Sequence, residues 1–208
     1  MNQILLVEGK DDLHVFSNIF KKHNVLQSFN IKDKEGIDAI YKSIPIYLKA
    51  DNSTIGVIVD ADTDIKSKWQ TLKSVLSEKG YDLPSKPMKE GTIIRKEYLP
   101  AFGIWIMPNN DENGMLEDFV NYLIPAGDKI MPFVESSLRL LETKQIAKYK
   151  LIHKSKAKIH TWLAWQETPG VPMGVAINKT YLDSNHKICI RFVNWINELY
   201  NEYPSKKN

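Results

Sequence analysis

The sequence predicts an α/β fold in which helices flank a largely parallel sheet, and two observations support this class. The runs at residues 5–7 and 54–59 are continuously apolar rather than alternating, which is typical of parallel strands buried on both faces. An amphipathic helical pattern follows each run. This alternation of strands and helices implies right-handed crossover connections on a parallel sheet.

The first helix is expected directly after the first strand, because apolar residues recur at helical spacing over residues 13–20. Residues 29–31 form a candidate second strand, and a further helical pattern runs over residues 36–48. Pro45 interrupts this pattern, so we expect that helix to kink or break.

The central elements follow the second apolar run. After the strand at 54–59, a strongly amphipathic helix is predicted over residues 69–76. Residues 81–90 hold two prolines and no periodicity, which indicates a connection. Residues 92–95 and 102–107 are then predicted as strands, the second of them at the centre of the sheet.

The rest of the chain is predicted to be helical. A polar turn at 108–114 precedes a helix over residues 115–123. Helical periodicity then recurs at 130–141, 159–165 and 189–200.

A chain of 208 residues can build one sizeable core, with or without an appended helical part. We expect residues 1–125 to form the α/β domain, and residues 126–208 to form a helical part that packs on it or continues it as one domain. Hydrophobic residues at 43% and charged residues at 25% are ordinary for a soluble globular protein. The single cysteine, Cys189, lies in an apolar run, which excludes a disulfide framework within the chain and predicts a core position.

The formal net charge of +3 is too small to identify a nucleic-acid-binding protein, because the local distribution of charge matters more than its sum. The first residues enter the first strand without a basic segment and a long apolar stretch, so no secretion signal is expected. No apolar run approaches the roughly 20 residues that span a bilayer. We therefore expect a cytoplasmic protein without a membrane partner.

Carboxylates stand at the end of both apolar runs. Glu8 follows the first run, and Asp60 and Asp62 follow the second. Open parallel sheets bind ligands at the carboxyl ends of their strands, so these side chains are expected to converge. Gathered carboxylates repel one another, and Mg²⁺, which takes hard oxygen ligands, relieves that repulsion. The structural alternatives are a helix-capping role for Glu8 and a solvated loop at 60–62.

Glu8-Gly9 after a strand and Asp60-x-Asp62 after a later strand resemble the TOPRIM domain. That domain is shared by type IA and type II topoisomerases, bacterial primases, overcoming-lysogenization-defect nucleases and small ribosomal-RNA maturation nucleases. The resemblance covers roughly the first half of the chain.

Two groups within this family are the most similar. Residues 7–12 resemble the small maturation nucleases, whereas the region after residue 107 is more similar to stand-alone TOPRIM proteins related to the overcoming-lysogenization-defect group. Stand-alone members often accompany ATPases or phage-defence systems. The resemblance therefore implies an ATPase or a defence-system protein as a candidate partner.

The resemblance also implies a site for Mg²⁺ or Mn²⁺. Glu8 would serve as a metal ligand or as a general acid and base, and Asp60 and Asp62 would serve as catalytic metal ligands. Asp64 is a weaker candidate ligand, because the residues on either side of it leave its local geometry open.

A further acid is expected from the helix that begins after residue 114. Glu117 and Asp118 both fall in its first turn, where the helix dipole alone favours acids. In the stand-alone TOPRIM group an acid at this place would complete the metal site. Adjacent helical residues diverge by about 100°, so we expect Glu117 to face the site and Asp118 to point elsewhere.

Basic residues are the candidate contacts to a phosphate backbone. Lys10, beside the Glu8 motif, is expected either to steady the charge that develops in phosphoryl transfer or to be solvated. Residues 143–165 contain no acid, and a solvated helix face is the alternative to phosphate contact there. The candidate nucleic-acid-binding residues of this run are Lys148, Lys150, Lys154, Lys156 and Lys158.

These patterns favour metal-dependent cleavage of a phosphodiester bond in DNA or RNA, with water as the nucleophile. The alternative is a non-catalytic module that binds Mg²⁺ and phosphate while it recognises RNA or a protein. The histidines show no zinc-ligand spacing. Residues 169–174 lack the features of a phosphate loop and are expected to form a turn or a loop that faces the site.

Overall fold

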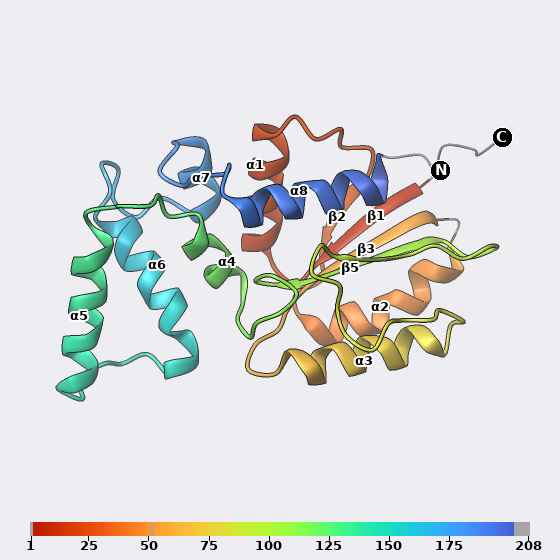
Figure 1. Cartoon of the computed structure of the whole chain (residues 1–208), viewed down its shortest axis with the longest axis horizontal. Coiled ribbons are helices and arrows are strands. Elements are labelled where there is room, and N and C mark those ends of the chain that lie inside the picture. Colours follow the sequence, from red (N-terminus) through yellow and green to blue (C-terminus); the bar gives the residue numbers. More distant parts are fainter. Residues whose placement is uncertain (1, 51, 202–208) are drawn as a thin grey trace.

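The computed structural model describes residues 2–50 and 52–201, and its strands form one five-stranded sheet in the order β2-β1-β3-β5-β4 (Figure 1). The parallel strands are β1 (Asn2–Val7), β2 (Asn30–Asp33), β3 (Asn52–Asp60) and β5 (Ala101–Met107). The edge strand β4 (Thr92–Ile94) is antiparallel to β5. The predicted α/β class with a largely parallel sheet is confirmed.

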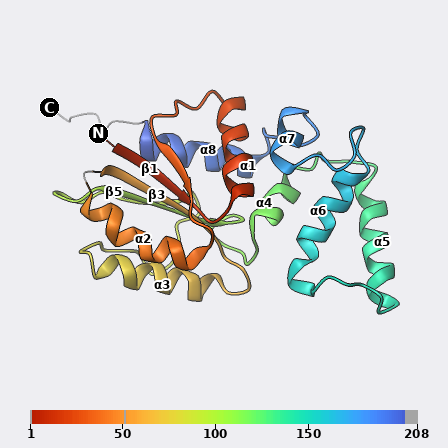
Figure 2. The same ribbon diagram turned by 180° about the vertical axis from the view of Figure 1, so that it is seen from behind.

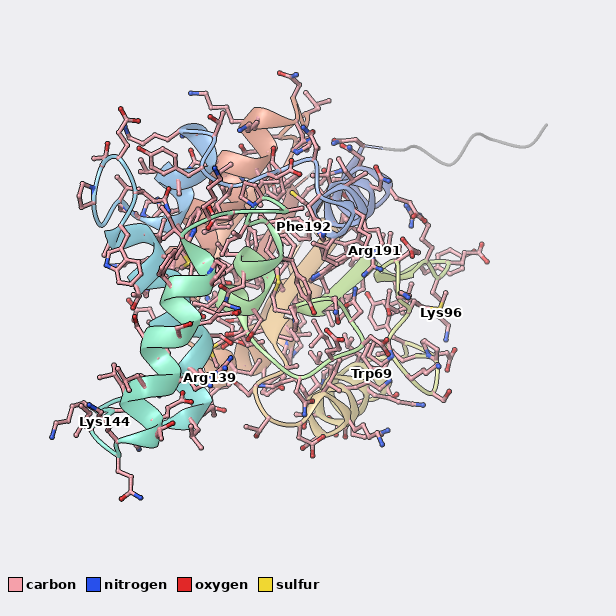
Figure 3. All side chains as sticks on the ribbon, turned by 60° about the vertical axis from the view of Figure 1, so that its left-hand side comes forward. Trp69, Lys96, Arg139, Lys144, Arg191 and Phe192 are labelled. Carbon is pink, nitrogen blue, oxygen red and sulfur yellow. The ribbon has the colours of Figure 1, made fainter. Side chains whose placement is uncertain are left out.

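Helices cover both faces of this sheet. One face is covered by α1 (Lys10–Lys22) and α8 (Lys187–Tyr200), and the other by α2 (Ile37–Lys49) and α3 (Ile65–Ser77), as Figure 2 shows from behind. The central strands are buried on both sides because their apolar runs contribute to two separate cores. Phe192 belongs to the first core and Trp69 to the second, and Figure 3 shows them on opposite sides of the strands.

A pair of glycines lets α8 approach the sheet closely. Gly56 of β3 lies beside Gly103 of β5 in the parallel register. A Cβ atom at Gly103 would collide with the side chains of Leu199 and Trp195. Helix α8 therefore packs against the sheet at the positions where these strands have glycine. The hydroxyl of Tyr200 donates to the carbonyl of Ile4 at 2.7 Å and ties the end of α8 to β1.

The helix α2 runs through Pro45 without a break. This differs from the expected interruption. Ile40 and Ile44, before the proline, are fully buried against the sheet, and Tyr47 and Leu48, after it, pack against the same core. This packing holds the helix on both sides of the missing N–H group.

The remaining helices form the region beyond the sheet. They are α4 (Leu116–Tyr122), α5 (Met131–Thr143), the short 3₁₀ helix η1 (Leu151–His153), α6 (Lys154–Ala164) and α7 (Met173–Asn178). Helices α5 and α6 form a hairpin beside the sheet (Figure 1), whereas α7 packs against α1, where Gly174 approaches the carbonyl of His14. Residues 169–172 form a turn and a short loop, as expected, and the helix α7 begins at Met173.

The helices after residue 125 do not form one separate unit attached to the sheet. The α5–α6 hairpin stands beside the sheet, but α8 returns to cover it, and Phe192 and Leu5 belong to the same core. Cys189 is buried in that core, as expected. No helix in the described ranges is long and apolar enough to cross a membrane.

Candidate active site

A cleft of about 920 Å³ opens at the carboxyl end of the parallel strands. One side is built by acids at or just after the ends of β1, β2 and β3, together with the start of α4, and the other side by η1 and α6. The acids lining it are Asp11, Asp12, Asp33, Glu35, Asp60, Asp62 and Glu117. The facing wall carries Tyr149, His153, Lys156 and His160.

Glu8 and Asp60, which end neighbouring strands, are directly bonded. The backbone N–H of Asp60 donates to Oε1 of Glu8 at 2.8 Å. Burial raises the pKa of Glu8, while this hydrogen bond and the charge of Lys68 act in the opposite direction. Glu8 is not among the residues that line the cleft, so its position supports Asp60 from the adjoining strand.

Asp60 lies at the centre of the acidic group. Its Oδ1 accepts the backbone N–H of Leu116 at 2.9 Å, which joins the end of β3 to the start of α4. The pKa of Asp60 lies well above its usual range, first because the half-buried carboxyl is partly desolvated. The charges of four neighbouring acids add to this shift, and they belong to Asp12, Glu8, Glu117 and Asp62.

Asp12, an acid in the first turn of α1, is a further member of this group. Its Oδ2 accepts the backbone N–H of Gly9 at 3.1 Å, so it does cap α1, but it also lines the cleft. Burial, followed by the charge of Glu8, raises its pKa to about 7. The sequence signal was an acid three residues after Gly9, a position that turns back toward the end of the strand.

Asp62 reaches the cleft through a turn and not as an extended continuation of β3. Its φ of 52° is left-handed, and its backbone exchanges two hydrogen bonds of 2.8 Å with Gly114. Its Oδ2 forms an ion pair of 2.9 Å with Lys68. Alternation along a strand therefore does not explain why Asp60 and Asp62 meet; the bridge to Gly114 does.

Glu117 and Asp118 diverge as expected. Glu117 is buried, lines the same cleft as Asp60 and forms an ion pair of 3.2 Å with Lys156. Asp118 turns back to accept the backbone N–H of Met115 at 2.9 Å and the hydroxyl of Ser155. Its carboxylate therefore holds α4 and α6 together rather than facing the cleft.

Asp64 and Lys10 lie in contrasting places. Oδ1 of Asp64 caps α3 by accepting the backbone N–H of Ser67 at 3.0 Å, and Asp64 is not among the residues lining the cleft. The structure therefore does not bring this candidate ligand to the other carboxylates, because its oxygen caps the start of α3.

Lys10 is exposed and lines the cleft, with no ion pair among residues 2–50 and 52–201.

The predicted basic segment divides into lysines with different surroundings. Lys154 pairs with Glu142 at 2.8 Å and Lys158 pairs with Glu135 at 2.6 Å, so acids of α5 compensate them. The run itself contains no acid, but its charge is partly compensated, because two of its lysines have partners on a neighbouring helix. Lys156 is the lysine of the run that lines the cleft, whereas the exposed Lys148 and Lys150 do not.

The acidic group suits a hard divalent cation in chemistry and position, since it offers carboxylate oxygens at the end of parallel strands. Across the described ranges, however, no three His, Cys, Asp or Glu side chains already stand as a metal-ligand set. Asp62 and Glu117 are instead turned to Lys68 and Lys156. The hydrogen bonds to Glu8 and Asp60 each occupy one carboxylate oxygen, which leaves the second as a candidate ligand.

Comparison with protein families gives one match that spans almost the whole chain. The model of a family described as a protein of unknown function, DUF3226, matches residues 2–201. Comparisons with curated proteins and with solved structures gave no match.

Proposed function

The chain belongs to the DUF3226 family, and we propose that it is a Mg²⁺- or Mn²⁺-dependent nuclease that cleaves phosphodiester bonds in nucleic acid. The observation that carries this proposal is the position of Asp60, a half-buried carboxyl at the end of β3 whose pKa is raised by desolvation and by four neighbouring acids. Such crowding is unfavourable without a cation and is common where chemistry takes place.

The metal ligands in this proposal are Glu8, Asp60, Asp62 and Glu117, with Asp12 added from the geometry. When bound, the cation would neutralise charge on the phosphate and lower the pKa of a water molecule that attacks it. The chain holds the acids in place through the backbone, since Asp60 bonds to Leu116 and Asp62 to Gly114. The ion pairs of Asp62 and Glu117 with lysines would open as the cation takes over their charge.

The wall opposite the acids carries side chains that can bind a phosphate-bearing substrate. Lys156, His153 and His160 line this wall, and Lys10, the first residue of α1, also lines the cleft. These side chains can donate hydrogen bonds to phosphate oxygens. An acidic floor that faces basic groups suits a phosphodiester held between a cation and the wall, whereas a cationic ligand would meet repulsion from the wall.

The order of the motifs adds independent support. Glu8 and Asp60-x-Asp62 follow adjacent parallel strands, which is the arrangement that the resemblance to the TOPRIM family implies. The same resemblance makes an ATPase or phage-defence protein a candidate partner.

A non-catalytic Mg²⁺- and phosphate-binding module is the second candidate. The observation that favours it is the pairing of two proposed ligands, Asp62 and Glu117, with Lys68 and Lys156. If these pairs persist, the site would have too few carboxylates to support hydrolysis.

Incubation of the purified chain with labelled single- and double-stranded DNA and RNA separates the two candidates. The nuclease proposal predicts shortened products with Mg²⁺ or Mn²⁺ and none with EDTA. Metal-dependent retention of intact substrate, without cleavage of any of the four, would instead support the binding module.

A further inference from the structure

A second pocket of about 440 Å³ lies beside α3 and away from the carboxylate cleft. It is bounded by the first two turns of α3, the connection at 85–89 and the turn at 110–111. Its volume falls within the range of about 300 to 1,000 Å³ that small-molecule sites occupy. None of its lining residues belongs to the carboxylate cleft.

Three lysines give this pocket a positive character. Lys66, Lys86 and Lys89 line it and are exposed, and within the described ranges none of them forms an ion pair. Their neighbour on α3, Lys68, differs because it is paired with Asp62. Asp111 is the acid among the lining residues, so three cations face one carboxylate.

The floor of the pocket is apolar and held in place. Ile65, Trp69 and Pro87 contribute to its lining, and Trp69 is almost fully buried. The indole Nε1 of Trp69 donates to the carbonyl of Pro84 at 3.2 Å, which fastens the connection to α3. Figure 3 shows Trp69 at the α3 side of the molecule, away from the α5–α6 hairpin that carries Arg139 and Lys144.

These features together specify the chemistry of a ligand. A flat apolar ring would contact the floor, an anionic group would meet the lysines, and Gln70 and Asp111 offer groups that bind hydroxyl or amino donors. A carboxylate that binds sugar hydroxyls is a common feature of nucleotide sites. We propose that this pocket binds a nucleoside monophosphate, with its phosphate at Lys66, Lys86 and Lys89 and its base against Ile65 and Pro87, above the buried Trp69.

Binding in this pocket does not require the proposed nuclease activity, although one chain segment contacts both sites. The segment from Asn110 to Gly114 lies between the two, since Asn110 and Asp111 line the second pocket and Gly114 bonds to Asp62. Asn113 anchors the same segment to α3, because its Oδ1 accepts the N–H of Ile65 at 2.9 Å. A ligand in the pocket would therefore contact a segment that also holds a residue of the cleft.

Calorimetric titration of the full chain with AMP and GMP tests the proposal, with EDTA present to exclude metal-dependent binding in the cleft. We expect at least one of the two to bind about tenfold or more tightly than adenosine, guanosine or inorganic phosphate, because each of these lacks half of the recognised groups. Binding should weaken as salt is raised, since charge attracts the phosphate. Failure of both monophosphates to bind would overturn the proposal.

Lysine variants test whether the nucleotide binds in this pocket. Replacing Lys86 and Lys89 with glutamine should weaken binding about tenfold or more, whereas Lys79→Gln, an exposed lysine outside the pocket, should leave it unchanged. Asp60→Asn should also bind normally, which separates this site from the cleft. Equal losses in the Lys79→Gln control, or no loss in the Lys86 and Lys89 variant, would contradict the assignment.

Discussion

The carboxylate of Glu8 accepts the backbone N–H of Asp60 at 2.8 Å, so the acids that end two adjacent strands are joined by a hydrogen bond. This bond gives Glu8 a structural role besides its proposed role at the metal. The two roles can be separated, because the bond requires an acceptor and metal binding requires a charge.

Substitutions at Glu8 should show this separation. Glu8→Gln keeps an acceptor for Asp60 N–H and removes a charge, so the metal-free protein should be as stable as the parent or more stable, while cleavage is lost. Glu8→Ala leaves that N–H without its partner and should cost about 1 to 3 kcal/mol of unfolding free energy. Thermal and denaturant unfolding in EDTA measure both, and equal destabilisation by the two variants would contradict the structural role.

The metal-free protein should lose stability as the pH rises. The pKa of Asp12 increases from 3.8 to about 7 on folding, so the folded state holds a proton that the unfolded state has released. Below 3.8 both states are protonated, and between 3.8 and about 7 folding becomes progressively less favourable. One pKa unit corresponds to about 1.4 kcal/mol, which unfolding titrations resolve.

Two variants test whether Asp12 causes this pH dependence of stability. Asp12→Asn should flatten the decline, because it retains an acceptor for Gly9 N–H and cannot ionise. Asp11→Asn, at the exposed neighbour, should preserve the decline. A stability curve that is flat in the parent protein would show that the buried acids are not crowded as described.

Lys156 should dominate the contribution of the basic segment to nucleic-acid binding. It lines the cleft, whereas Lys158 is directed to Glu135 on α5. Lys156→Gln should weaken binding and reduce the salt slope by about one unit, and Lys158→Gln should change neither. Filter binding over a salt series checks this, and equal effects of both variants would mean that the hairpin acts only as a diffuse basic surface.

The glycine at position 103 should be essential to the packing of α8 on the sheet. Gly103→Ala places a methyl group against Leu199 and Trp195 and should cost about 1 to 3 kcal/mol, as overpacking does. Adding Leu199→Ala should recover part of that loss, because it vacates the space. A double-mutant cycle from denaturant unfolding tests the contact, and strictly additive losses would contradict it.

The strands and the convergence of their acids were predictable because both follow from local sequence. Continuous apolar runs identified β1, β3 and β5, and the acids that end β1 and β3 met at one edge because parallel strands share it. Glu117 was also anticipated, from the divergence of adjacent residues on a helix.

The failures have a common cause, which is contact between segments distant in sequence. Whether Asp62 or Asp64 enters the cleft depends on the bridge to Gly114, and no spacing in the sequence reveals that bridge. The partners of Lys154 and Lys158 lie on α5, outside the acid-free run. Asp12 resembled an ordinary helix-start acid because it is one, and only the fold adds its second role.

The central claim is that catalysis takes place at Asp60, and comparison of two aspartate variants tests it most directly. Asp60→Asn removes the central charge of the cleft, whereas Asp64→Asn is a matched control at a helix cap, where asparagine is also favoured. With Mn²⁺ and a substrate that the parent protein cuts, we predict no cleavage by Asp60→Asn and unchanged cleavage by Asp64→Asn. Undiminished cleavage by a folded Asp60→Asn protein would contradict the account.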